Sequence, residues 1–229
     1  MIKAVIFDLD DTLISERAYI ESGFWHISGL LAKRLEIEKE DIFNRLMELF
    51  SSDSKNVFNR LLNQLEFSYT NEFVLHLVTE YRSHFPDIEF YEDVIPCLDF
   101  LKSKRLKTGI ITDGFEITQR RKMESLKASH LFDLVIYTDE LGGEYWKPHP
   151  LAFEIMKERL EVEYHEMIYI GDNPNKDFYI KKIHRIHTIR IQRNGIYNDR
   201  SYLEGIKADY EIKSLAELPA IISAMNSNA

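Results

Sequence analysis

Two aspartates near the start of the chain have a spacing that suits joint chemistry. An apolar segment, residues 3–7, runs directly into Asp8-Leu-Asp-Asp-Thr12. At the end of a buried strand Asp8 and Asp10 lie close together, and their negative charges repel unless a cation or a shared proton compensates them. The pattern therefore predicts a carboxylate nucleophile, a magnesium site, or both. Taken alone, it also fits two aspartates that only cap a turn.

Three later segments carry further polar residues at the expected ends of strands. In the first, a hydroxyl is followed by a glycine, which lets the backbone turn closely around an anion. In an open parallel sheet, ligands bind beyond the carboxyl ends of the strands, so we expect all these side chains at one rim. The residues are Thr112, Asp113 and Gly114, then Lys147 just before a helix start, and finally the carboxylates Asp172 and Asp177.

The elements that position these residues begin with a helical block. Apolar residues recur at spacings of three and four from Ile20 to Leu35, which is typical of one face of an amphipathic helix. Similar faces occur at residues 42–50, 57–65 and 73–81. Four consecutive helices without a strand predict a small helical bundle with its own core.

From residue 93 onward, helices and strands alternate. One helix is expected to start at Pro174 with Asn173 as its N-cap, and the last helix at a capping box of Ser214 and Glu217. The expected strands are residues 107–112, 133–137, 167–170, 187–191 and 209–212, and the other helices are residues 94–104, 117–127 and 150–160.

This alternation predicts an α/β fold, with a doubly wound, Rossmann-like parallel sheet covered on both faces. The helical block interrupts that core just after its first strand. We therefore expect an α/β core in residues 1–14 and 88–229, and a four-helix cap in residues 15–87.

The bulk composition excludes several classes of protein. The 229 residues carry a formal charge of −9, and the pI of about 5.4 argues against nucleic acid or an anionic membrane as the main partner. The single cysteine, Cys97, excludes an internal disulfide. The first apolar run, residues 4–7, is too short for a signal peptide, and no segment approaches membrane-spanning length. We expect a cytoplasmic protein, and its oligomeric state stays open.

With these four motifs in order, the chain resembles the haloacid dehalogenase (HAD) superfamily, in the form with a helical cap inserted after the first motif (C1 type). The resemblance covers nearly the whole chain. It implies that Asp8 is the nucleophile, that Asp10 is the general acid and base, and that Thr112 and Lys147 bind the phosphoryl group. The acids of the fourth motif are Asp172 and Asp177.

The resemblance also implies a metal and a binding site for phosphate. Magnesium is expected on Asp8, the backbone carbonyl of Asp10 and Asp172, whereas Asp177 acts through water or orients Lys147. The residues expected to bind the phosphoryl group of the substrate are Thr112, Asp113, Gly114 through its backbone N–H, and Lys147.

The cap offers one candidate for substrate specificity. Trp25 projects away from the apolar stripe of the first cap helix. The side chain either covers the leaving group of the substrate at the cleft between cap and core, or packs against a neighbouring cap helix.

These features together predict a magnesium-dependent phosphomonoester hydrolase that acts on a small phosphorylated metabolite through an aspartyl phosphate. A phosphosugar mutase that uses the same core is the alternative, because transfer back to substrate depends on how the cap excludes water. A 2-haloacid dehalogenase is disfavoured because similar dehalogenases lack an acid at the position of Asp10. A non-catalytic binding protein is disfavoured by the repulsion within a complete carboxylate set.

Overall fold

The computed structural model describes residues 1–195, 197 and 200–227. Its centre is a six-stranded sheet in the order β3-β2-β1-β4-β5-β6, and every neighbouring pair is parallel. The predicted parallel α/β fold is therefore confirmed. The strands are β1 (Ala4–Phe7), β2 (Lys107–Thr112), β3 (Leu134–Tyr137), β4 (Met167–Gly171), β5 (His187–Ile191) and β6 (Tyr210–Ile212).

Helices cover both faces of the sheet, so its central strands are apolar on both sides. Alternate residues of β1 face different clusters: Val5 and Phe7 pack in one, and Ala4 and Ile6 in the other. The first cluster is covered by α5 (Val94–Ser103), α6 (Glu116–Ser125) and α9 (Leu218–Ser227), and the second by α7 (Leu151–Leu160) and α8 (Ile180–Ile183).

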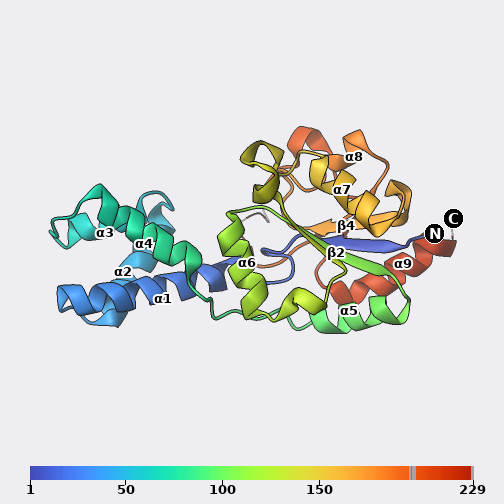
Figure 1. Cartoon of the computed structure of the whole chain (residues 1–229). Helices are drawn as coiled ribbons and strands as arrows, with labels where there is room; N and C mark the ends of the chain where they lie inside the picture. The colour runs from blue at the N-terminus through green and yellow to red at the C-terminus, as the bar shows by residue number, and fades with distance from the viewer. Residues whose placement is uncertain (196, 198–199, 228–229) are drawn as a thin grey trace.

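The helical block forms α1 (Glu16–Leu35), α2 (Lys39–Ser52), α3 (Val57–Gln64) and α4 (Asn71–Ser83). These helices share a hydrophobic cluster that contains no residue of the sheet. Ser15 begins α1, since its side chain accepts a hydrogen bond from the backbone N–H of Ala18. In Figure 1 the block extends from the carboxyl end of β1, while both termini lie at the opposite end of the core.

Helix α6 lies next to the block and ties it to the core (Figure 1). The hydroxyl of Thr118 donates to the carbonyl oxygen of Arg82 at 3.2 Å, and the hydroxyl of Ser125 donates to that of Pro86. The connections into and out of the block also meet, because Ile14 and Phe90 form an antiparallel bridge.

The predicted helix start at Pro174 is wrong. Residues 174–179 form hydrogen-bonded turns, and α8 begins only at Ile180. The reason is local: the buried carboxylate of Asp177 accepts a hydrogen bond from the backbone N–H of Asn173 and holds this segment against β4. Asn173 caps the turn instead, since its side chain accepts from the backbone N–H of Asn175 at 3.0 Å.

The capping box at the last helix is confirmed, because Ser214 and Glu217 make both of its hydrogen bonds. Short 3₁₀ helices complete the chain: η1 (Ala128–His130), η2 (Thr138–Leu141), η3 (Gly143–Tyr145), η4 (Tyr164–Glu166), η5 (Leu203–Gly205) and η6 (Leu215–Glu217).

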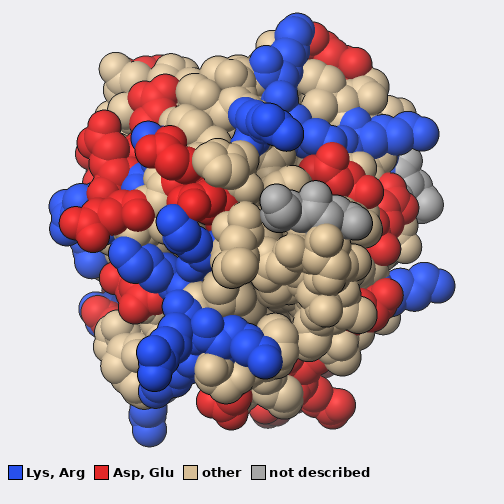
Figure 2. Space-filling view, turned by 90° about the vertical axis from the view of Figure 1, so that its right-hand side faces the viewer, with Lys and Arg blue, Asp and Glu red and all other residues tan. Residues whose placement is uncertain are grey.

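Acidic and basic side chains are interspersed on the face opposite helices α1–α4, as Figure 2 shows, and neither sign covers that face. Within the described part of the chain, no helix combines the length and the apolar character needed to cross a membrane.

Candidate active site

The end of β1 turns sharply and brings its aspartates to the carboxyl rim of the sheet. The backbone N–H of Asp8 still donates to the carbonyl of Ile170 on β4, at 2.8 Å. Beyond it, the carbonyl of Leu9 accepts from the N–H of Leu13, and Asp11 takes a left-handed conformation with φ of 50°. This tight loop keeps Asp8 buried and leaves Asp10 partly exposed.

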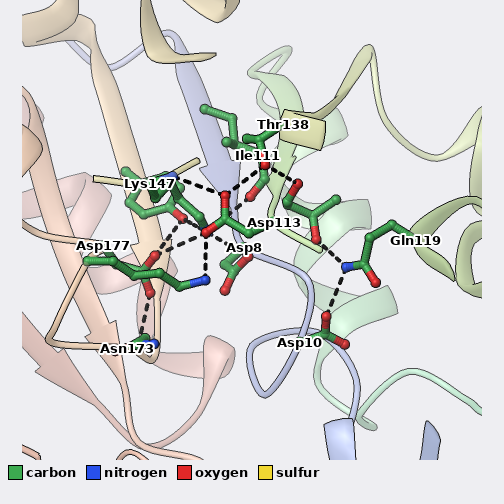
Figure 3. Close-up of polar contacts among 12 residues, drawn as sticks. Asp8, Asp10, Ile111, Asp113, Gln119, Thr138, Lys147, Asn173 and Asp177 are labelled. Carbon is green, nitrogen blue, oxygen red and sulfur yellow. Dashed lines mark hydrogen bonds and ion pairs between the residues drawn. The ribbon is translucent and has the colours of Figure 1, made fainter. Parts of the chain in front are cut away.

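Lys147 is the buried centre of the site (Figure 3). Its Nζ atom lies 2.8 Å from Asp8 Oδ1 and 3.1 Å from Asp177 Oδ1, and it donates to the hydroxyl of Tyr169 at 2.8 Å. Burial alone would lower the pKa of Lys147, but the carboxylates of Asp177 and Asp8 outweigh it and hold this pKa well above its ordinary value. Lys147 is therefore a permanent cation in contact with Asp8.

Three buried carboxylates come together beside this lysine. Asp8, Asp172 and Asp177 each offer an oxygen atom, and these atoms lie within 4.8 Å of one another. Burial raises the pKa of Asp172 to about 9, helped by the charges of Asp177 and Asp8. Burial also raises the pKa of Asp8 to about 6, against the opposing effect of Lys147.

One oxygen of Asp172, Oδ2, is buried and has no hydrogen-bond partner among the described residues. An unpaired buried carboxylate oxygen is costly, and a divalent cation would remove both that cost and the repulsion that raises the pKa of Asp172. The donors are all oxygens, which suits a hard ion such as Mg²⁺. The residues present therefore fit a magnesium site.

The motif that follows β2 is held by its own contacts. Asp113 accepts from the backbone N–H of Lys147 at 3.1 Å and from Lys176 Nζ at 2.7 Å. Burial opposes ionisation of Asp113, but the charges of Lys147 and Lys176 lower its pKa overall. Thr112 is fully buried, and its hydroxyl accepts a hydrogen bond from Gln119. Gly114 follows with φ of 117°, a conformation that glycine adopts readily.

The carboxylate of Asp10 lies apart from the group around Lys147 and points toward α6 (Figure 3). Its Oδ1 atom accepts from Lys122 Nζ at 2.6 Å, and its Oδ2 atom from Gln119 Nε2 at 2.9 Å.

A cavity of about 320 Å³ opens over these residues. Asp177 and Thr112 are not part of its lining: the first lies behind Lys147, and the second is covered by Gln119. The lining residues are Asp8, Asp10, Asp11, Glu16, Asp113, Gly114, Trp146, Lys147, Asp172, Asn173, Lys176 and Tyr197.

Trp25 lies outside this cavity. Its ring packs edge to face against Phe43 of α2, with centroids 5.5 Å apart, and Lys39 Nζ lies 3.7 Å from the centre of its ring. These contacts correspond to the second of the two expectations, that Trp25 packs against a neighbouring cap helix.

Several residues at the site were not anticipated from the sequence. Lys176 stands in the same motif as Asp172, where a cation between acids is a usable signal. Tyr169 had a weaker signal, since its hydroxyl lies within a buried strand and needs a partner. Gln119 and Lys122 had none, because they belong to a helix so polar that its buried positions look like exposed ones.

Comparison with known proteins agrees with this arrangement. Residues 5–190 match the family model described as haloacid dehalogenase-like hydrolase, so the chain belongs to that family. The predicted family is thereby confirmed.

Among curated proteins, the chain is 30% identical over 229 residues to a glyceraldehyde 3-phosphate phosphatase of Methanopyrus kandleri, and the match covers 97% of each chain. It is also 30% identical to the protein of that name from Methanocaldococcus jannaschii, over 100% of both chains. A pyrophosphatase PpaX of Bacillus cereus is 27% identical, with 98% of each chain covered. Because these relatives are matched over their full length and are named as phosphatases, the prediction that the chain is a phosphatase is confirmed.

Two solved structures show the same fold. A HAD phosphatase from Thermococcus onnurineus matches with a TM-score of 0.63 and 31% identity, over 96% of this chain and 98% of that one. A putative β-phosphoglucomutase from Thermotoga maritima has a TM-score of 0.70 at 21% identity, over 97% and 99% of the two chains.

Proposed function

We propose that this phosphatase hydrolyses a small phosphorylated metabolite through a covalent phosphate on Asp8. The observation that carries the proposal is the placement of Asp8 at the cavity, in contact with the cation of Lys147 and beside the unpaired oxygen of Asp172. A nucleophile, a fixed positive charge and carboxylate oxygens able to ligate a metal are the elements that support phosphoryl transfer.

The proposed reaction has two steps. Asp8 attacks phosphorus, the bond between phosphorus and the ester oxygen breaks, and Asp10 gives its proton to the departing alkoxide. Water then attacks the phosphorus of the aspartyl phosphate and passes a proton to Asp10. The bond between phosphorus and the Asp8 oxygen breaks, so inorganic phosphate is released and Asp8 is restored. Lys147 stabilises the phosphoryl charge from a fixed position, because Asp177 and the hydroxyl of Tyr169 hold its ammonium group.

Magnesium completes the proposed site. Asp8 and Asp172 are the proposed side-chain ligands, with the backbone carbonyl of Asp10, and the ion would stabilise negative charge on the transferring phosphoryl group. We propose that Asp177 holds Lys147 in place and does not bind the metal, since its oxygens already contact Lys147, Tyr169 and Asn173. Asp113, Gly114 and Lys176 are proposed to shape the phosphate-binding side of the cavity.

We propose a substrate of triose to hexose size. The cavity of about 320 Å³ lies at the lower end of ligand pockets, and the M. kandleri and M. jannaschii relatives are named for a triose phosphate. Residues 15–87 are proposed as the cap that covers the substrate, since α1–α4 have a core of their own and begin directly after the motif of Asp8.

The test is a phosphate-release assay on purified protein. The panel contains glyceraldehyde 3-phosphate, phosphoglycolate, hexose phosphates and pyrophosphate, each with Mg²⁺ and with EDTA, and sugar isomers are measured in parallel to detect a mutase. We expect release of phosphate from a monoester that depends on Mg²⁺. Full activity after chelation, or no release from any ester, would contradict the proposal.

The matched control is Asp8→Asn, which is nearly isosteric but poorly nucleophilic. We expect kcat to fall by at least about 10³-fold, because the covalent step is lost. The melting temperature should stay close to that of the wild type, since Lys147 keeps its contacts with Asp177 and Tyr169.

A further inference from the structure

Helix α6 directs two buried polar side chains at the carboxylate of Asp10. Lys122 and Gln119 are only 3% and 1% exposed, although they lie on a helix with mostly polar residues. Lys122 Nζ lies 2.6 Å from Oδ1 of Asp10, and Gln119 Nε2 lies 2.9 Å from Oδ2. Each oxygen of Asp10 therefore has its own donor, and the two donors fix both the position and the rotation of the carboxylate.

The burial of Lys122 is costly without a partner. A lysine cation in the interior requires an ion pair, and within the described part of the chain Asp10 is the carboxylate at ion-pair distance from it. An apolar side chain of similar length would fill the same space at lower cost. The lysine is thus explained by what it does to Asp10, and packing alone does not explain it.

Gln119 links Asp10 to the motif after β2. The same amide nitrogen that contacts Asp10 also donates to the hydroxyl of Thr112, which is fully buried. Thr112 ends β2, an internal strand of the sheet. Through Gln119, the carboxylate of Asp10 is therefore anchored to a rigid part of the core.

Lys122 also contacts the first cap helix. Its Nζ atom lies 4.4 Å from the ring centre of Tyr19 on α1, and the hydroxyl of Tyr19 donates to the carbonyl of Tyr81 on α4 at 3.1 Å. The lysine therefore lies between Asp10 and Tyr19, and Tyr19 in turn links α1 to α4.

We infer that Lys122 and Gln119 are positioning residues for proton transfer by Asp10, an inference that rests on the proposed function. Asp10 loses a proton to the alkoxide when the ester bond breaks, and regains one from the water that attacks the aspartyl phosphate. Lys122 and Gln119 keep their own protons throughout, and only hold the carboxylate where both transfers are possible.

The leaving group of the substrate provides the test. A departing p-nitrophenolate is stable as an anion and needs little protonation, whereas an alkoxide needs a proton. For Lys122→Met we expect kcat/KM to fall by about 10²-fold or more on an alkyl phosphate such as glycerol 3-phosphate, and by less than about tenfold on p-nitrophenyl phosphate. Gln119→Met should show the same selectivity with a smaller loss.

Three comparisons separate positioning from folding. Lys122→Arg should recover part of the activity on the alkyl ester, because it restores the donor. Lys102→Met, the same substitution at an exposed position on α5, should leave kcat/KM unchanged on both esters. The double variant of Asp10→Asn and Lys122→Met should be no slower on the alkyl ester than Asp10→Asn alone, since the two residues act through one proton transfer.

An equal loss on both esters in Lys122→Met and in Gln119→Met would overturn the inference and make both residues purely structural. Failure of the wild type to release phosphate from these two esters and from every ester of the metabolite panel would instead refute the proposed function.

Discussion

Asp172 and Asp177 lie in the same loop, yet their carboxylates have opposite surroundings. Asp177 is fully buried, pairs with Lys147 and accepts hydrogen bonds from Tyr169 and from the backbone of Asn173. Asp172 keeps one buried oxygen without a partner among the described residues. At the scale of single residues, this difference supports the proposed roles, in which Asp172 binds the metal and Asp177 holds the lysine.

Substitution of each acid by its amide should reveal this difference. For Asp172→Asn, we expect the Mg²⁺ concentration for half-maximal activity to rise by about 100-fold or more, because a ligand charge is lost. For Asp177→Asn, we expect about a tenfold rise, as for outer partners of a metal site, together with a lower melting temperature. Activity titrations with Mg²⁺ and thermal unfolding measure both effects. A larger rise for Asp177→Asn would exchange the two roles.

At the scale of elements, the site is made by the register of two central strands. Phe7 of β1 is paired with Ile170 of β4, so Asp8 and Asp172 leave the sheet near each other. Parallel strands with apolar residues on both faces were readable from the sequence, and their polar ends followed directly. The strand ends could therefore be predicted together with the rim at which ligands bind.

Other parts of the site depend on contacts that periodicity does not encode. The turns at residues 174–179 replace the expected helix because Asp177 bonds to the backbone of Asn173, a contact invisible in the hydrophobic pattern. Lys122 and Gln119 occupy buried positions of a polar helix, where residue type predicts exposure. The sequence does not decide where Trp25 packs, because this depends on how α1 meets α2.

The juxtaposed ends of β1 and β4 predict a pH-dependent effect of metal on stability. In the metal-free protein, the pKa of Asp8 is raised from 3.8 to about 6 and that of Asp172 from 3.8 to about 9. The folded state thus holds these protons more tightly than the unfolded state, so this contribution to stability falls as the pH rises from about 4 to about 9. Mg²⁺ binds the ionised carboxylates, so its stabilising effect should grow over the same range.

Thermal unfolding at pH 6 and pH 9, with EDTA and with saturating Mg²⁺, measures this linkage. We expect the increase in melting temperature caused by Mg²⁺ to be larger at pH 9. In Asp172→Asn the increase should be small at both values of pH. An increase of the same size at pH 6 and pH 9 in the wild type would refute the linkage.

The contact between α1 and α2 yields a prediction for Trp25. Trp25→Ala removes an edge-to-face contact with Phe43 and the cation–π contact with Lys39, together worth about 1–2 kcal/mol. We expect the melting temperature to fall by roughly 2–8 °C, with equal effects on kcat/KM for all substrates. Leu75→Ala, at an exposed position on α4, serves as the control. A change in substrate preference without loss of stability would contradict this prediction and favour the alternative, in which Trp25 covers the leaving group of the substrate.

At the scale of the whole molecule, the net charge is −9, and the active-site cavity likewise has more acidic than basic side chains in its lining. Its two lysines are already paired, Lys147 with Asp8 and Lys176 with Asp113. Among the described residues, its lining contains no arginine, while Glu16 contributes a carboxylate from the start of α1. A second anionic group on a substrate would therefore meet repulsion beyond the phosphate-binding side.

Glu16→Gln should reduce this selection against anionic leaving groups. Glyceraldehyde 3-phosphate and 3-phosphoglycerate differ only in an aldehyde against a carboxylate, so their kcat/KM ratio isolates the charge. We expect the wild type to prefer the aldehyde, and Glu16→Gln to narrow the ratio by roughly tenfold, as for loss of one nearby charge. Burial, with the charge of Asp10, raises the pKa of Glu16 to about 7, so the wild-type preference should be stronger at pH 8 than at pH 6. A ratio unchanged by both the substitution and the pH would place the leaving group away from Glu16, and the selection would then belong to another part of the cavity.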